Sequence, residues 1–169
     1  IDSLDNMGYE NAAVFGTEKI YDNQVTAEIL KPVYYNTEDM PFRICGMSDQ
    51  MPYDSTVYSQ MTEEQIDTLI ENFRKALIEV KEEFKPDIVI SHHLFFITDL
   101  VKEIFADTEV VGISHGTDMR QIKKHHKFLP RLDHLKDLDY VLTVTDMEDD
   151  AIINLLGVDE SKIHNVGGG

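Results

Sequence analysis

From Thr62 onward, the apolar positions of the chain alternate between helical spacing and short continuous runs. Apolar residues recur every three or four positions over residues 66–84 and again over residues 97–105. This spacing places them on one face of a helix. Thr62 and Gln65 have the separation of a capping box, so the first helix is predicted to begin there and to end before Pro86.

Four short apolar runs predict buried strands. Most of them contain β-branched residues and lack the polar alternation of a half-exposed strand, which is typical of parallel strands covered on both faces. The predicted strands span residues 87–90, 110–113, 140–144 and 163–166.

Helical patterns fill the chain between the last three of these strands. The charged stretch 119–138 is predicted to be helical, with an interruption at Pro130. Thr145 and Glu148 have the spacing of a second capping box, and Gly157 is predicted to stop the helix that follows.

Strands that alternate with helices indicate βαβ units with right-handed crossovers. We therefore expect an α/β fold, a Rossmann-like parallel sheet with helices on both faces, as a single domain over residues 1–169. The first part of the chain follows this pattern less clearly. Residues 12–15 are predicted as a strand after a helix tail at 1–7, and residues 32–60 as strand pieces within a long loop.

Composition and charge narrow the classes of function. The 169 residues include 32 acidic and 15 basic ones, for a net charge of −17, and a surface of that sign repels nucleic acid and anionic membranes. No apolar run approaches the roughly 18 residues of a membrane span. The first ten residues lack a signal-peptide pattern, and the single cysteine, Cys45, fits a reducing compartment. We expect a cytoplasmic protein with no nucleic-acid partner and no transmembrane segment.

The stretch "ISHGTDMRQ" follows the second predicted strand and carries the best candidate site. Ligands of open α/β sheets bind at the carboxyl ends of the strands. His115 can donate a hydrogen bond or carry a proton there, and Gly116 permits either a close approach or a positive φ. Thr117 and Asp118 can cap the next helix, whose N-terminus attracts anions. A plain strand–turn–helix cap is the competing interpretation, and the residues alone leave both open.

The other histidines and the cationic residues give weaker signals. The pairs His92-His93 and His125-His126 are adjacent, and adjacent side chains point apart, so we expect no metal site. A basic stretch over residues 120–131 is suited to steer an anionic substrate, although a solvated helix face explains most of its lysines. Arg120 lies nearest to His115 and is the member that we expect to bind substrate. Serine-hydrolase, dinucleotide and P-loop motifs are absent.

Four segments give the chain a family resemblance. In chain order they read "KPDIVISHHLFFITDLV", "VVGISHGTDMRQ", "DYVLTVTDMEDDAI" and "GVDESKIHNVGGG". They resemble the N-terminal, acceptor-side domain of GT-B glycosyltransferases of the family 4 type. The resemblance covers residues 62–169 and extends to "MGYENAAVFG", which resembles the end of the first helix and the second strand of that domain.

In this family two Rossmann-like domains face each other across a cleft. The resemblance implies that a C-terminal domain binds the nucleotide of a nucleotide-sugar donor and that the N-terminal domain receives a small-molecule or glycan acceptor. It further implies transfer of a hexosyl group with retention and without a metal or another cofactor.

The resemblance also assigns roles to residues of this chain. His115 matches the family histidine at the strand end, and it is implied to contact the donor sugar or its phosphate as the catalytic residue. Gly116, Thr117 and Asp118 match the same turn. His93 and Arg120 are further positions implied to bind substrate.

Two parts of the family pattern are missing from the sequence. The first strand with its Gly-rich loop would precede Ile1, and the C-terminal donor domain would follow Gly169. We therefore expect this domain to be inactive alone and to belong to a larger protein. Two other functions stay open, a non-catalytic sugar- or phosphate-binding module and a GT-B-like sugar-nucleotide epimerase. The chain beyond Gly169 separates the module from the enzyme, and product analysis with and without acceptor separates the epimerase.

Overall fold

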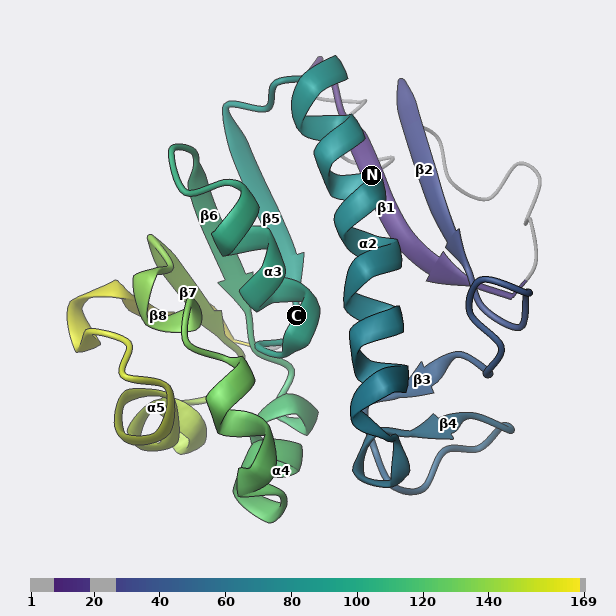
Figure 1. Cartoon of the computed structure of the whole chain (residues 1–169). Coiled ribbons are helices and arrows are strands. Elements are labelled where there is room, and N and C mark those ends of the chain that lie inside the picture. The colour runs from purple at the N-terminus through teal and green to yellow at the C-terminus, as the bar shows by residue number, and fades with distance from the viewer. Residues whose placement is uncertain (1–7, 19–26, 168–169) are drawn as a thin grey trace. The chain divides into compact units, whose positions relative to one another are not determined.

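The computed structural model of the chain describes residues 8–18 and 27–167, and the chain forms two compact units that divide between Lys85 and Pro86. It is an α/β protein in which helices flank parallel sheets, consistent with a Rossmann-like fold (Figure 1). The helix tail predicted at residues 1–7 lies outside the described ranges. No helix within those ranges combines the length and the apolar character that a membrane span requires.

The first unit contains a parallel pair of strands that confirms the strand predicted at residues 12–15. β1 (Ala12–Thr17) pairs in parallel register with β2 (Ile29–Tyr34). Pro32 lies within β2, where a strand at the edge of a sheet tolerates the missing N–H donor.

The remainder of this unit is a loop region and one long helix. β3 (Cys45–Gly46) and β4 (Thr56–Val57) form a second short parallel pair, which the 3₁₀ turn η1 (Tyr58–Gln60) follows. α2 (Glu63–Glu83) begins at Thr62, whose side chain and that of Gln65 each accept the other's backbone N–H. The predicted capping box is therefore confirmed, and α2 packs on β1 and β2.

The second unit is built on a four-stranded parallel sheet in the order β5-β6-β7-β8. The four predicted strands are confirmed, as β5 (Ile88–His92), β6 (Glu109–Ile113), β7 (Tyr140–Thr143) and β8 (Ile163–Asn165). β5 and β6 both point toward the end of the unit where α4 lies (Figure 1). The carboxyl ends of neighbouring strands therefore meet at one edge of the sheet.

The helices of this unit match the sequence less closely than its strands. α3 (Phe96–Ile104) is confirmed. The stretch 119–138, predicted to be helical with an interruption at Pro130, divides into three pieces, α4 (Thr117–Lys124), η2 (His126–Arg131) and η3 (Leu135–Asp137). The first break comes at His125, whose φ of −131° and ψ of 71° leave the helical region, five residues before Pro130.

The predicted capping box at Thr145 is wrong. Thr145 makes no side-chain cap bond, and the Glu148 carboxylate instead lies within hydrogen-bond distance of the Ser114 hydroxyl. The segment forms a 3₁₀ turn, a short helix and a π-helical turn before β8. These elements are η4 (Asp146–Glu148), α5 (Asp149–Ala151), η5 (Ile152–Leu156) and the 3₁₀ turn η6 (Glu160–Lys162). Gly157 stops the π-helical turn with a φ of 72°, as predicted.

Close packing fixes the helices of the second unit on its sheet. A Cβ atom on Gly112 of β6 would lie 2.7 Å from Leu94 and 2.9 Å from Leu138, so the glycine permits this approach. The rings of Phe95, Phe96 and Phe128 pack together with centroids 4.3–5.4 Å apart. These contacts hold the turn after β5 and the start of α3 against η2.

Two charged side chains on α3 hold the segment that leads into β7. The Asp99 carboxylate accepts the backbone N–H of His134 at 2.7 Å and its ring Nδ1–H at 3.0 Å. The Lys102 ammonium, which is 8% exposed, donates to Asp139 at 2.7 Å, and the Val110 N–H donates to the same oxygen at 2.9 Å. Burial raises the pKa of Asp139, but these two hydrogen bonds outweigh burial and the net pKa is lowered.

Candidate functional site

The carboxyl ends of β5 and β6 bring three histidines together. The two strands pair in parallel with His92 opposite Ile113, so that His92 and His93 reach the same edge as His115. His93 has a φ of +67°, which ends the strand and changes the direction of its side chain. The expectation that adjacent histidines point apart is therefore wrong for this pair, because both rings contact His115.

The His92 and His115 rings share one proton position. Nδ1 of His92 lies 2.9 Å from Nε2 of His115, and the rings are nearly parallel with centroids 5.2 Å apart. A neutral imidazole has one donor and one acceptor nitrogen, so the tautomer of one ring sets that of the other. When His92 donates, Nδ1 of His115 carries a proton that it can donate to a ligand; when His115 donates, its Nδ1 becomes a base.

Two of the three histidines have a lowered pKa, which favours their neutral form. Burial lowers the pKa of His92, and the charge of a protonated His115 lowers it further. Burial also lowers the pKa of His93, against the opposing effect of the Asp118 carboxylate. Nδ1 of His93 is buried and has no hydrogen-bond partner. At neutral pH these rings therefore provide hydrogen-bonding groups more than positive charge.

Asp118 connects the two turns that carry the histidines. The fully buried carboxylate accepts the Leu94 N–H at 2.7 Å, the Ser114 hydroxyl at 3.1 Å and the Met119 N–H at 3.0 Å. Leu94 follows β5, and Ser114 follows β6. Asp118 therefore connects the turn after β5 with the turn after β6. It is the second residue of α4 and not its N-cap, so the prediction that it caps the helix is wrong.

Gly116 is the residue that begins α4. It has a φ of 75°, it lies at the N-cap position, and no side chain caps the helix. A Cβ atom added there would collide with the Glu148 carboxylate. The left-handed backbone therefore favours glycine at this position, and the missing Cβ atom leaves room for the Glu148 carboxylate.

Glu148 adds a second carboxylate to this edge. Its Oε2 lies 3.2 Å from the Ser114 hydroxyl, which also lies within hydrogen-bond distance of Asp118. A hydroxyl has one proton, so Ser114 serves one carboxylate at a time. The same hydroxyl oxygen accepts the Gly116 N–H at 3.4 Å.

Thr117 and Arg120 occupy the first turns of α4. Thr117 is half-buried, and Arg120 is exposed. The backbone N–H and the side-chain Nε of Arg120 both donate to the carbonyl of Gly116, at 3.1 Å and 3.4 Å. These bonds hold the start of the guanidinium beside the turn that follows His115.

The structure thus brings together His93, His115, Gly116, Asp118 and Arg120 with Thr117 at one edge of the second unit. Sequence reasoning missed His92 and Glu148. The signal for His92 was its place at the end of a predicted strand that lies next to the His115 strand. No comparable signal existed for Glu148, whose spacing from Thr145 pointed to a cap.

Comparison with known proteins adds no family to this geometry: no family model matches the chain, and no curated protein matches it. Among residues 8–18 and 27–167, no group of three or more histidine, cysteine or acidic side chains is arranged to hold a metal ion.

Proposed function

We propose that the chain is the acceptor-side, Rossmann-like domain of a GT-B glycosyltransferase. In the intact protein it transfers a hexosyl group from a nucleotide-sugar donor to an acceptor, with retention of configuration. The observation that carries this proposal is the convergence of His92, His93 and His115 at the ends of neighbouring strands, beside the left-handed Gly116 turn.

In this proposal His115 is the catalytic residue. Its ring is exposed at the strand edge, where it can donate a hydrogen bond to the donor sugar or to the phosphate that leaves with the nucleotide. His92 is a positioning residue, because its Nδ1 shares a proton with Nε2 of His115 and so fixes which His115 nitrogen faces the substrate.

The remaining residues shape the substrate site. Gly116 and Thr117 form the turn that admits the substrate, and Asp118 holds the two turns at a fixed separation through Leu94. His93 and Arg120 lie at its sides, where the ring and the guanidinium offer hydrogen-bond donors to sugar hydroxyls or to an anionic group.

The test is a transfer assay on the intact protein with a panel of nucleotide sugars. We expect His115→Ala to lower kcat by about a hundredfold or more, the usual effect of removing a group that transfers or stabilises a proton. His126→Ala is the matched control, since His126 is an exposed histidine on η2. A His115→Ala variant within about twofold of wild type in kcat, a few tenths of a kcal/mol, contradicts the role.

The His92 variants separate positioning from catalysis. His92→Asn retains a polar atom near the Nδ1 position, whereas His92→Leu does not, so Asn should recover part of the kcat that Leu loses. Nitrogen NMR shifts of His115 should show a changed tautomer only in His92→Leu. Release of an epimerised nucleotide sugar without acceptor would assign the epimerase function instead, and binding without any turnover would assign the binding module.

A further inference from the structure

The contact between His92 and His115 has the geometry of a linear hydrogen bond. The facing nitrogens are 2.9 Å apart, and the ring centroids are 5.2 Å apart. That centroid distance equals the nitrogen separation plus one ring radius at each end, so both nitrogens lie close to the line that joins the ring centres. The N–H bond of one ring is therefore aimed at the lone pair of the other, as a good hydrogen bond requires.

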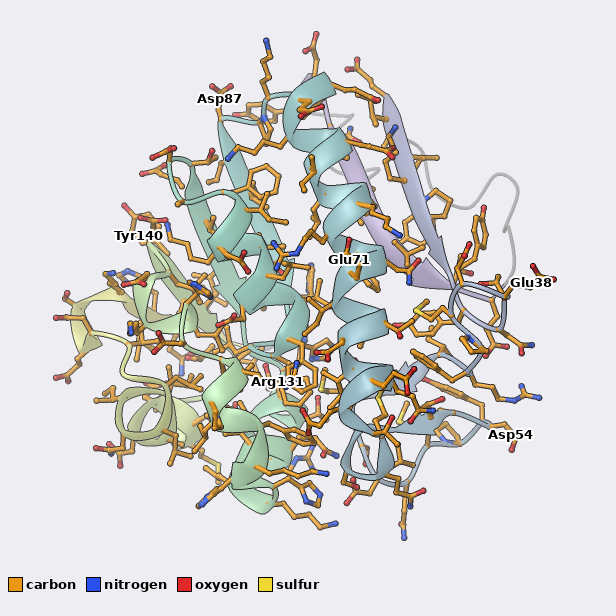
Figure 2. The ribbon with its side chains drawn as sticks, in the orientation of Figure 1. Glu38, Asp54, Glu71, Asp87, Arg131 and Tyr140 are labelled. Atoms are coloured by element: carbon orange, nitrogen blue, oxygen red, sulfur yellow. The ribbon has the colours of Figure 1, made fainter. Side chains whose placement is uncertain are left out.

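The outer nitrogens of the same two rings point away from this contact. Both histidines are exposed. Among the residues that the structure describes, none is hydrogen-bonded to Nδ1 of His115 or to Nε2 of His92. In Figure 2, Asp87 and Tyr140 mark the amino ends of β5 and β7, and the histidines lie at the opposite, carboxyl end of the sheet. One outer nitrogen can therefore meet a substrate there while the other meets water.

The partner of His115 differs from the usual partner of an oriented histidine. Such a ring is commonly bonded to a carboxylate or a backbone carbonyl. His134 has this arrangement in the same unit, because its Nδ1 donates to the Asp99 carboxylate. The Asp118 carboxylate is instead bonded to backbone N–H groups and to a hydroxyl, and His115 is paired with a second imidazole. An imidazole can take up a proton at one nitrogen and release one from the other.

The same geometry limits the charge of the pair. Two N–H groups cannot face each other across 2.9 Å, so the contact persists only while the two rings together carry at most one positive charge. Burial and the charge of a protonated His115 lower the pKa of His92, so a proton that reaches His92 leaves readily at neutral pH. The other ionisable groups on the turns around the pair are His93, Asp118, Arg120 and Glu148.

We propose that His92 and His115 form a two-ring proton relay, in which uptake of a proton at Nδ1 of His115 releases another from Nε2 of His92. At the start, Nε2 of His115 donates to Nδ1 of His92, and Nε2 of His92 carries a proton. Uptake at His115 moves the shared proton onto Nδ1 of His92, and Nε2 of His92 gives its proton to water. Three bonds to hydrogen break and three form, and both rings are neutral before and after.

The proposed transfer reaction supplies a proton for this relay. The acceptor hydroxyl loses its proton to Nδ1 of His115 as its oxygen bonds to the sugar. The reverse passage returns a proton from water through His92, and Nδ1 of His115 then protonates the departing phosphate, which restores the starting tautomers. This use of the relay rests on the proposed function, whereas the passage of a proton between the rings does not. His92 thereby has a role beyond fixing the tautomer of His115.

The first test is NMR of the isotope-labelled chain without any substrate. We expect the shared proton to show one-bond coupling to both facing nitrogens, because it crosses the contact. We also expect both rings to titrate together in two steps about one pH unit or more apart, about tenfold in proton affinity. In His92→Asn, His115 should titrate in one step. The exposed His126 is the internal control and should titrate in one step in both proteins.

Coupling of the proton to only one nitrogen overturns the proposal, and so does a His115 titration that is identical in wild type and His92→Asn. The second test measures transfer by the intact protein in mixtures of H₂O and D₂O. The rate should depend on deuterium content along a curve in wild type, because more than one proton moves, and linearly in His92→Asn, which keeps a polar atom near Nδ1 but passes no proton. A linear dependence in wild type overturns the relay. An intact protein that transfers no sugar contradicts the proposed function while the NMR outcome still decides the relay, so the two proposals fail separately.

Discussion

Replacing Asp118 tests the link between the two turns of the candidate site. The carboxylate is fully buried and accepts three hydrogen bonds, from Leu94, Ser114 and Met119. Asp118→Ala removes all three acceptors at once. Asp118→Asn keeps one carbonyl oxygen in nearly the same volume and replaces the other oxygen by a donor.

The expected loss of stability depends on which hydrogen-bond donors lose their acceptor in each variant. The Leu94 N–H is buried and would have no acceptor in Asp118→Ala, at a cost of about 1–3 kcal/mol. Ser114 retains Glu148 as an alternative acceptor at 3.2 Å, so its loss is smaller. We expect Asp118→Ala to lower the free energy of unfolding by about 3 kcal/mol and Asp118→Asn by about 1 kcal/mol.

Urea unfolding measures these values, provided that the slope against denaturant is unchanged. Asp107→Ala, at an exposed position after α3, is the control and should stay within about 0.5 kcal/mol of wild type. An Asp118→Ala variant as stable as this control would refute the reasoning. Because the Asp118 carboxylate raises the pKa of His93, Asp118→Asn should lower that pKa further in an NMR titration. An unchanged or raised pKa would contradict the electrostatic part of the argument.

Three further outcomes follow from single contacts. Gly116→Ala should lower the free energy of unfolding, measured with urea, by about 1–2 kcal/mol because the position has a positive φ. Adding Glu148→Ala to this variant should restore only the part of the loss that comes from the collision with the Glu148 carboxylate. Asp139→Ala should lower the free energy of unfolding by about 3 kcal/mol, because it leaves the buried Lys102 ammonium without its partner. Lys102→Met should lower it by less, and a larger loss in Lys102→Met than in Asp139→Ala would contradict this account. Burial raises the pKa of Cys45 to about 12, so its alkylation rate in the folded chain should stay low from neutral pH up to about pH 10 and rise sharply in urea.

The second unit was the more predictable part of the fold. Its strands are continuous apolar runs, and its long-range order follows from the rule that parallel strands connect through helices. The first unit was harder, because Pro32 breaks the apolar pattern of β2, and β3 and β4 have only two residues each. Such short pieces are defined by their partners and not by local sequence.

The site was predictable as a location but not as a set of contacts. His115 and Gly116 were identified from their place after a strand. The contacts of His92 and His93 with His115 depend on the register of two strands and on the left-handed backbone of His93. Neither feature can be predicted from the neighbouring residues in the sequence. Asp118 and Glu148 were both read as helix caps, because a carboxylate near a helix start has that meaning in the absence of tertiary structure.

The bond between Asp118 and Leu94 has a consequence for how the site assembles during folding. The Leu94 amide donates to Asp118, which lies 24 positions further along the chain in the next βα segment. This amide therefore gains protection from hydrogen exchange only when the two βα segments have packed together. A pulse-labelling experiment can therefore measure when this one amide becomes protected during folding. That time reports when the edge that carries the histidines has formed, and the measurement needs no substrate.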